Sequence, residues 1–341
     1  MKTVVLNQPG EFLLTHTELP EAPPPGQATV RVRRVGVCGT DFHAFRGKQP
    51  FFSYPRILGH ELGVEVVSLG STESELQPGD LCAVEPYLNC GSCIACRRGR
   101  TNCCVELKCL GVHTDGGMRE LINLPLKKLH RSRTLTLQQL ALVETLGIGA
   151  RAVERATLEC GETVLVIGAG PIGLSVIEFA RLAGVRIIVM DTNEDRLQFC
   201  QSGFKIDLAI EAGEGALSRI KDFTSGDMPV AVFDATGNRQ SMMEAFNLVA
   251  NSGRLVLVGL VLADISFHDP DAHRRELTLL CSRNSTPAIF KRIIGLMESG
   301  QIDTTPWITH QASIEDMIQE FPSWMDPKTK VLKAMVALDK D

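Results

Sequence analysis

Four cysteines stand close together in the sequence, with the spacing C-x2-C-x2-C-x7-C: Cys90, Cys93, Cys96 and Cys104. Four thiols at this spacing can fold into a tetrahedral thiolate cage for Zn²⁺. Because the protein would fill every position of such a cage, the metal would be structural. Cys103 adjoins Cys104 and is the alternative fourth ligand. Disulfides, reactive thiols and a free-standing zinc ribbon are the other interpretations, but a ribbon usually divides its ligands into two pairs separated by a longer loop.

A second group of metal-binding residue types begins with Cys38, which precedes Thr40 and His43, and continues with the adjacent pair His60 and Glu61. A thiol, an imidazole and a carboxylate suit zinc, and three protein ligands leave a fourth position open for water or substrate. The spacing therefore predicts a catalytic metal site that is separate from the cysteine cluster.

Glu144 lies inside an apolar run at residues 142–146. An unpaired carboxylate is costly to bury, and a nearby Zn²⁺ would compensate its charge. Glu144 is predicted either to ligate the catalytic metal directly or to exchange with Glu61 while a water occupies the remaining place. The alternative is a solvent-facing position on a helix.

A glycine-rich turn follows a strand predicted at 163–167 and opens a helix, and an acid ends the next strand: Gly168, Gly170, Pro171, Ile172, Gly173 and Asp191. This order is typical of a dinucleotide site, in which glycines let the backbone approach a pyrophosphate at a helix N-terminus. Asp191 would accept hydrogen bonds from the ribose and repel a 2′-phosphate, so NAD is expected rather than NADP. Arg196 weakens that preference. An ordinary tight turn is the alternative.

Two later strand ends and one arginine are expected in the same cofactor crevice, because ligands bind beyond the carboxyl ends of such strands: Thr236, Val258, Gly259, Leu260 and Arg283. Both strand ends have plain turns as the alternative. Arg283 has two further candidate partners, a zinc-ligating glutamate and the carboxylate of a substrate.

The length of 341 residues predicts two domains, since single cores stop growing efficiently near roughly 250–300 residues. A hydrophobic content of 44% and a net charge of −5 indicate a globular protein without a basic field for nucleic acid or anionic lipid. The N-terminus has no signal-peptide core, so a cytoplasmic location is expected. In that compartment the eleven cysteines indicate metal ligands and buried thiols rather than disulfides.

Short alternating strands broken by Gly and Pro fill residues 1 to about 135, for example at 29–33, 62–67 and 80–84. This alternation predicts an antiparallel, barrel-like domain. Thr136 begins a capping-box signature that predicts a helix. From 162 to about 282, Val/Ile/Leu runs alternate with helical segments, which indicates a doubly wound parallel sheet.

The segment after residue 282 is predicted to return to the first domain, because a separate domain of about sixty residues would be marginal. Pro287 starts a predicted helix there, and a helix near 313–321 and a strand near 331–336 follow. The expected division is a catalytic zinc-binding domain of residues 1–145 and 285–341, with the cysteine lobe at 88–106, and an NAD-binding domain of residues 146–284.

Five motifs in order, GVCGTDxH, GHE, the four-cysteine lobe, GVHTDGG from Gly111 to Gly117, and GAGPIG, resemble the zinc-containing medium-chain dehydrogenase/reductase family over nearly the whole chain. The resemblance implies a GroES-like β-barrel domain and a Rossmann domain. It implies two zinc ions per chain, one at Cys38, His60 and Glu61 with Glu144 nearby and one in the cysteine lobe. It also implies NAD as cofactor and a proton relay through Thr40 and His43. The carboxylate at Glu144 resembles the polyol and threonine dehydrogenase branch.

Three shorter stretches, 49–56, 99–104 and 282–286, resemble bacterial sugar-acid dehydrogenases that act on L-galactonate or L-gulonate. The resemblance implies oxidation of a secondary hydroxyl to a keto acid by hydride transfer to NAD. A sugar acid needs a counterion for its carboxylate, and bidentate geometry favours arginine. The candidates by position, besides Arg283, are Lys48, Arg56 and Arg119.

Other functions remain as alternatives to the sugar-acid dehydrogenase. A polyol dehydrogenase of the sorbitol type or an L-threonine 3-dehydrogenase would share every motif. A catalytically silent binding protein would be expected to lose Cys38, His60 or Thr40, which are all present. A zinc-finger-like nucleic-acid binder would need a basic stripe beyond the lobe. The expected partners are a small-molecule substrate and further copies of the chain, as a homodimer or homotetramer joined through the strand ending at Cys281, with no nucleic acid and no membrane.

Overall fold

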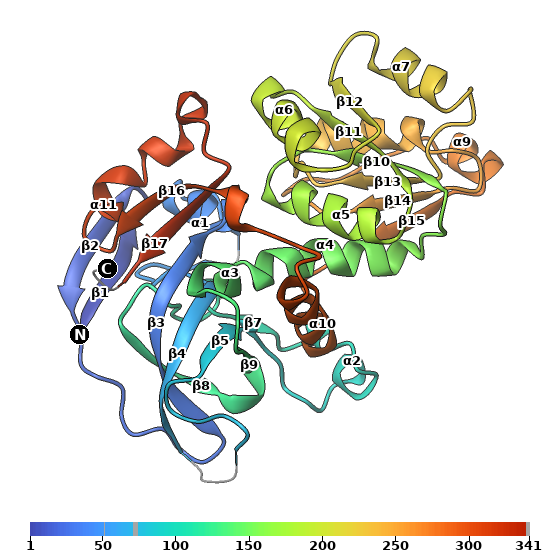
Figure 1. Cartoon of the computed structure of the whole chain (residues 1–341). Coiled ribbons are helices and arrows are strands. Elements are labelled where there is room, and N and C mark those ends of the chain that lie inside the picture. Colours follow the sequence, from blue (N-terminus) through green and yellow to red (C-terminus); the bar gives the residue numbers. More distant parts are fainter. Residues whose placement is uncertain (51, 71–73, 339–341) are drawn as a thin grey trace. The chain divides into compact units, whose positions relative to one another are not determined.

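The computed structural model describes residues 1–50, 52–70 and 74–338. The chain divides into two compact units, a first unit of Met1–Glu144 with Thr286–Asp341 and a second unit of Thr145–Ser285 (Figure 1). These limits lie one residue from the domain limits expected from the sequence. Phe51, in the 49–56 stretch, lies outside the described residues.

The first unit is built on a seven-stranded sheet in the order β16-β17-β3-β4-β5-β9, with β8 paired to β3. All neighbours are antiparallel except β16 and β17, so the predicted antiparallel domain contains one parallel pair. The bounds are β3 (Gln27–Val37), β4 (Glu61–Leu69), β5 (Leu81–Val84), β8 (Leu121–Pro125), β9 (Leu129–Ser132), β16 (Ile308–Ser313) and β17 (Lys333–Ala337).

Two small sheets and short helices surround this sheet. The strands are β1 (Lys2–Gln8) with β2 (Glu11–His16), and β6 (Tyr87–Leu88) with β7 (Lys108–Cys109). The helices are α1 (Gly39–Phe45), α2 (Ile94–Arg97), α3 (Leu137–Ala141), α10 (Pro287–Glu298) and α11 (Met317–Glu320). Short 3₁₀ turns cover Thr101–Cys103, Leu126–Lys128, Thr305–Trp307, Ser323–Met325 and Pro327–Thr329.

The predicted helix starts are confirmed where a cap was visible in the sequence. Thr136 accepts a hydrogen bond from the Gln139 backbone, and Gln139 completes the capping box of α3. In α10 the apolar face of the sequence pattern is buried, as Ile293 and Phe290 illustrate. The helix expected near 313–321 is wrong in extent: Ser313 ends strand β16, which pairs with β17, and only Met317–Glu320 is helical.

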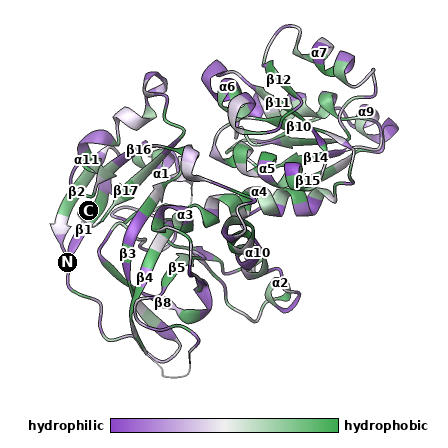
Figure 2. Cartoon of the chain, viewed as in Figure 1, coloured by the Kyte–Doolittle hydropathy of each residue, from purple (hydrophilic) through white to green (hydrophobic). Residues whose placement is uncertain are grey.

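The second unit contains a six-stranded, fully parallel sheet in the order β12-β11-β10-β13-β14-β15. The strands are β10 (Thr163–Ile167), β11 (Arg186–Asp191), β12 (Leu208–Glu211), β13 (Ala231–Asp234), β14 (Arg254–Leu257) and β15 (Thr278–Cys281). Every residue of β10 and β13 is buried, so both faces of the sheet centre are covered. Figure 2 shows hydrophobic residues along these strands.

The helices of the second unit connect successive parallel strands. They are α5 (Pro171–Leu182), α6 (Glu194–Gly203), α7 (Ala216–Phe223), α8 (Arg239–Glu244) and α9 (Asp269–Arg274), with a 3₁₀ turn at Ala245–Leu248. Helix α4 (Val143–Ala156) begins with the last two residues of the first unit. Strand order reverses at β10, which lies between β11 and β13, and in such sheets this reversal marks the ligand crevice.

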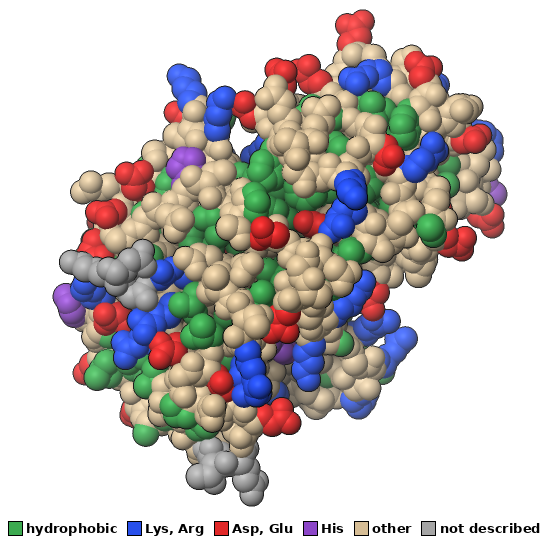
Figure 3. Space-filling view, viewed as in Figure 1, with side chains coloured by type: hydrophobic (Ala, Val, Ile, Leu, Met, Phe, Trp, Pro, Cys, Tyr) green, Lys and Arg blue, Asp and Glu red, His purple; other side chains and the backbone are tan. Residues whose placement is uncertain are grey.

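The surface is mixed in charge. On the face displayed in Figure 3, Lys and Arg side chains are interspersed with Asp and Glu. No helix within the described residues is both long and apolar enough to cross a bilayer.

Candidate active site and metal centres

Cys38, His60 and Glu61 bring their sulfur, nitrogen and oxygen ligand atoms within 4.8 Å of one another. The antiparallel register of β3 and β4 explains this meeting, because Gly36 near the end of β3 pairs with Glu61 at the start of β4. A Cβ atom at Gly36 would lie 2.1 Å from Glu61 Oε2, so only glycine leaves room for the carboxylate. Cys38 follows β3 directly, so the pairing of Gly36 with Glu61 brings Cys38 and Glu61 close together.

Asp41 supports both Cys38 and His60. Its Oδ2 accepts a hydrogen bond of 2.9 Å from the Cys38 backbone N–H at the start of α1, and its Oδ1 lies 3.8 Å from His60 Nδ1. Burial raises the pKa of Asp41, although the charge of His60 opposes the shift. Burial alone would lower the pKa of His60, but the charges of Asp41 and Cys38 outweigh it and raise that pKa well above its ordinary value.

Lys333 holds Glu61 from the opposite side. Its Nζ donates to Glu61 Oε1 at 2.6 Å and to the Val37 carbonyl at 3.0 Å. Both charged side chains are almost fully buried, with exposed fractions of 2% for Lys333 and 1% for Glu61. The pKa of Lys333 is raised: burial alone would lower it, but the charges of Glu61 and Cys38 prevail.

Glu144 is buried in the same region, and the Tyr87 phenol donates a short hydrogen bond to its Oε1. Burial raises the pKa of Glu144, opposed by the charge of His60, and burial also raises the pKa of Tyr87 well above its ordinary value. Tyr87 pairs with Cys109 across β6 and β7, and burial raises the pKa of the Cys109 thiol to about 12.

The charge balance of this cluster fits a divalent cation. Three carboxylates, those of Asp41, Glu61 and Glu144, are buried with exposed fractions of 1%, 1% and 5%, and Lys333 supplies one compensating cation. Asp41 Oδ1 and His60 Nδ1 are buried and make no hydrogen bond within the described ranges. A zinc ion would compensate the excess negative charge, and a thiolate, an imidazole and a carboxylate are ligands that zinc accepts.

The expected proton-relay residues lie on the helix that follows Cys38. Thr40 Oγ1 is 3.6 Å from Cys38 Sγ. His43 stands three residues later on α1, a spacing that puts it on the same helix face as Thr40. Its side chain is exposed, and its pKa is lowered by partial burial and by the charges of Arg46 and Lys48.

The three substrate-binding candidates differ in how far neighbouring carboxylates already compensate their positive charge. Arg56 contacts Asp115 at 3.3 Å and donates to Ser53 at 2.7 Å, so its charge is partly compensated. Arg119 donates to the Gly116 carbonyl at 3.1 Å, and burial lowers its pKa. Lys48 is exposed. In residues 1–50, 52–70 and 74–338, neither Arg119 nor Lys48 forms an ion pair with a carboxylate.

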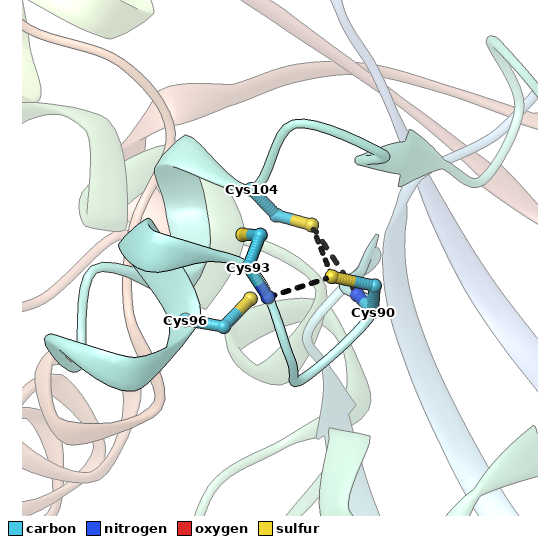
Figure 4. Close-up of side chains that lie close together, drawn as sticks. All are labelled: Cys90, Cys93, Cys96 and Cys104. Atoms are coloured by element: carbon cyan, nitrogen blue, oxygen red, sulfur yellow. Dashed lines mark hydrogen bonds between the residues drawn. The ribbon is translucent and has the colours of Figure 1, made fainter.

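The cysteine lobe gathers its four thiols around one point, as Figure 4 shows. The Cys104 and Cys90 sulfurs are 3.4 Å apart, too far for a disulfide, and the ligand atoms of all four lie within 4.8 Å of one another. Backbone N–H groups of Cys93 and Ser92 lower the pKa of the Cys90 thiol to about 6, which favours the thiolate that a metal requires. Cys103 is exposed and lies outside this group.

The glycine-rich turn has the close approaches that its sequence predicts. Gly168 has a φ of +92°, and its backbone N–H bonds to Met190 O at 2.8 Å. A Cβ atom at Gly173 would lie 1.7 Å from the Gly168 carbonyl oxygen, so glycine is required there. Gly170 caps α5, with Pro171 and Ile172 in its first turn. The first N–H groups of α5 are therefore available to an anion.

Asp191 ends β11 beside this turn. Its Oδ2 accepts from the Ala169 backbone at 2.6 Å, its Oδ1 accepts from the Asn193 backbone at 2.8 Å, and Arg196 Nη1 lies 4.0 Å away. The carboxylate thus fixes the glycine turn to the neighbouring strand, and Arg196 also lies 3.6 Å from the Cβ position of Gly170. These residues form one side of the candidate cofactor site.

The other predicted cofactor residues lie at the ends of β13 and β14 and after β15. Thr236 Oγ1 donates to Asp234 at 2.6 Å, and its methyl group is 3.2 Å from the Cβ position of Gly168. A Cβ at Gly259 would lie 2.4 Å from the Gly237 backbone, so the two turns touch. Val258 is buried, Leu260 is exposed, and Arg283 follows β15 by two residues.

Sequence reasoning missed four residues at or beside the metal cluster. Asp41 was part of a quoted motif without a role, although its spacing of three residues from Cys38 is a capping-box signal. Lys333 and Tyr87 gave no local signal, because pairing of β17 with β3 and of β6 with β7 brings them to the site. Cys109 had been attributed to packing alone, yet its pKa responds to the charges of His60 and Glu144.

Known families match both units. Residues 24–134 match the family described as "Alcohol dehydrogenase GroES-like domain", and residues 171–299 match "Zinc-binding dehydrogenase". The L-galactonate-5-dehydrogenase of Escherichia coli K12 is 36% identical over 98% of this chain and 98% of that protein. The chain belongs to the zinc-type alcohol dehydrogenase family. The predicted family, fold class and enzyme class are confirmed.

A further relative and a solved structure also resemble this chain. The L-arabinitol 4-dehydrogenase of Hypocrea jecorina is 31% identical, over 92% of this chain and 85% of that protein. The crystal structure of the Escherichia coli CFT073 alcohol dehydrogenase rspB, in complex with NADH, superimposes with a TM-score of 0.92 at 28% identity and covers 99% of both chains.

A pair of serine variants in the lobe distinguishes the two candidate fourth ligands. We expect Cys104→Ser to lose one zinc per chain and to lower the melting temperature, because a closed structural site contributes directly to folding. Cys103→Ser is the matched control and should keep the zinc content and melting temperature of the parent. Metal analysis after dialysis measures the zinc content of both variants, and thermal unfolding measures their melting temperatures. Loss of zinc from Cys103→Ser with retention by Cys104→Ser would instead assign the ligand to Cys103.

Proposed function

We propose that this chain is a zinc- and NAD-dependent dehydrogenase that oxidises a secondary hydroxyl of a sugar acid, of the L-galactonate or L-gulonate type, to a keto acid. The observation that carries the proposal is the convergence of half-buried Cys38 with buried His60 and Glu61, among buried carboxylates that exceed the charge of Lys333, in a chain that also has the Gly168–Gly173 turn. Similarity to the L-galactonate dehydrogenase supports the substrate class.

The proposed metal ligands are Cys38, His60 and Glu61, with Glu144 beside them, and the four lobe cysteines would hold a second, structural zinc. Zinc, when bound, supplies a Lewis acid that lowers the pKa of a substrate hydroxyl, and NAD supplies the hydride acceptor. Asp41 fixes the N-terminus of α1 and faces the His60 ring, which is the arrangement that orients an imidazole ligand.

Thr40 and His43 would remove the proton. Oxidation of a CH–OH group releases a hydride to the cofactor and a proton to the protein, which leaves C=O. The Thr40 hydroxyl, whose Oγ1 lies 3.6 Å from Cys38 Sγ, would take that proton, and the exposed imidazole of His43 would pass it to solvent. The lowered pKa of His43 keeps the imidazole neutral near pH 7, so that it can accept.

The second unit would bind NAD through the glycine turn and Asp191. The N-terminus of α5 presents free N–H groups to the pyrophosphate, and a second negative charge beside Asp191 would be repelled. Arg196 lies 4.0 Å from Asp191 and is a cation that could accommodate a 2′-phosphate. Binding of NADH by the related rspB supports NAD as the cofactor.

An uncharged polyol is the second candidate substrate. Similarity to L-arabinitol 4-dehydrogenase favours it, and the metal chemistry would be unchanged. The distinction depends on whether a cation is available for a substrate carboxylate. Arg119 fits this requirement, because its backbone anchor Gly116 packs against Gly59, the residue before His60.

The function is tested by a substrate panel in which NADH formation is followed. We expect L-galactonate or L-gulonate to have a kcat/KM at least roughly tenfold above that of galactitol or sorbitol, since a charge-assisted contact to the carboxylate contributes about 1.5 kcal/mol or more. Arg119→Met and Lys48→Met, each compared with the parent, identify which cation is responsible by a selective rise in KM for the acids. A preference for sorbitol would reject the sugar-acid proposal and favour the polyol.

The relay role of His43 has a pH signature. In the oxidation direction kcat/KM should rise with pH through an apparent pKa below 6.5, because the protonated imidazole cannot accept and the pKa of His43 is lowered from that value. His43→Asn should turn over more slowly and should lack this acidic limb. His16→Asn, at an exposed position on β2, is the control. An unchanged pH profile in His43→Asn would exclude the role.

Self-association through β15 is part of the proposal. This strand ends the parallel sheet and pairs with β14 alone within the described chain, and three of its four residues are exposed. An unpaired, apolar edge strand is a surface at which a second copy can add its own edge.

A charge on this edge tests the interface. We expect Leu279→Lys to convert the assembly to a smaller species in light scattering after size exclusion, because a lysine ammonium would be desolvated on pairing. Leu217→Lys on α7 is a matched control, since the exposed fractions of Leu279 and Leu217 are 44% and 43%. The same mass for Leu279→Lys and the parent would place the interface elsewhere.

A further inference from the structure

Tyr87 is a buried residue that the activity described above does not use. It lies on β6 with an exposed fraction of 2%, and its phenol donates to Glu144 Oε1. The chain has two tyrosines, and the other, Tyr54, donates to the backbone carbonyl of Ala44. A phenol is an unusual partner for a carboxylate at this depth, where charged groups are normally paired with cations.

Glu144 has one oxygen engaged and one available. Oε1 accepts from Tyr87, while within residues 1–50, 52–70 and 74–338 Oε2 accepts no hydrogen bond. Helix α3 packs against β4, the strand that begins with Glu61, and Glu144 follows the end of α3 by three residues. The charges of His60 and Glu61 also act on the pKa of Glu144. Glu144 is nevertheless outside the group whose ligand atoms lie within 4.8 Å of one another, which comprises Cys38, His60 and Glu61.

Glu61 is held in a different way. Lys333 donates to it at 2.6 Å, and the absence of a side chain at Gly36 lets its carboxylate reach the group. The two glutamates of the cluster therefore have separate tethers, a lysine for Glu61 inside the group and a phenol for Glu144 outside it. A tether of this kind can decide which carboxylate becomes a ligand.

We propose that Tyr87 is a positioning residue that keeps Glu144 out of the metal's ligand set. Its hydrogen bond retains Glu144 next to the site, so that the direct protein ligands are Cys38, His60 and Glu61 and the remaining position stays open for the substrate hydroxyl. The inference rests on the proposed function and adds to it the residue that selects between the two glutamates.

Removal of the phenol oxygen should release Glu144 toward the metal. A buried carboxylate that loses its donor gains most by binding the cation, because an unsatisfied buried charge is costly. We expect Tyr87→Phe to release metal to a chelator about tenfold more slowly than the parent and to lower kcat by about tenfold, since Glu144 would occupy the open position.

The experiment uses the full chain loaded with zinc or with Co²⁺. Metal release to dipicolinate and the visible absorption of the cobalt protein are measured for the parent, Tyr87→Phe and Tyr54→Phe. The control Tyr54→Phe also removes a phenol hydrogen bond in the first unit and should match the parent in both measurements. Tyr87→Phe in a Glu144→Gln background should add no further change, because its effect is transmitted by Glu144.

Glu144→Gln alone provides a second test that does not require Tyr87→Phe to fold. Its amide oxygen can still accept from Tyr87, so metal content should stay at the parent level if Glu144 is outside the ligand set. Loss of metal in Glu144→Gln would overturn the inference, as would parent-like release and cobalt spectra in Tyr87→Phe. A parent that takes up zinc in the cysteine lobe alone would instead refute the proposed function, which keeps the two failures distinct.

Discussion

Electrostatic balance inside the first unit is the constraint on which its site depends. The carboxylates of Asp41, Glu61 and Glu144 are buried close to one lysine, Lys333, and a cluster so composed is costly without further positive charge. The backbone supplies part of the compensation, because the Cys38 N–H donates to Asp41. A divalent cation would supply the rest. The buried charge therefore indicates a divalent cation, and the ligand types indicate that it is zinc.

Strand pairing explains why residues so distant in sequence share this cluster. Glu61 pairs opposite Gly36, and β17 pairs with the same strand, where Ala334 lies opposite Val37. Lys333 therefore reaches Glu61 only because the chain returns to the first unit after residue 285. Because of this return, the last strand of the chain, β17, contributes Lys333 to the candidate metal cluster of the first unit. The C-terminal segment therefore does more than complete the core.

The sequence predicted most of what is local. Short motifs identified the lobe cysteines, the Cys38 and His60 region and the glycine turn, since their chemistry requires particular residue types at fixed spacing. The extent of α11 was misjudged because the preceding strand β16 continues to Ser313, and its parallel pairing with β17 has no periodic signature in the sequence. Tyr87 and Lys333 could not be predicted, because a buried partner across a sheet depends on register, which one sequence does not reveal.

The two candidate metal sites differ in how their remaining ligand positions are controlled. In the lobe, four thiols converge, which would fill every position of a tetrahedral zinc, and backbone N–H groups of Cys93 and Glu106 bond to the sulfurs. In the other cluster, three ligand types converge while Lys333 and Tyr87 each restrain one carboxylate. A closed site needs only enough ligands, whereas an open site also needs a means of keeping an available ligand away. The second requirement accounts for the buried phenol beside Glu144, whereas the buried lysine holds and compensates Glu61 inside the group.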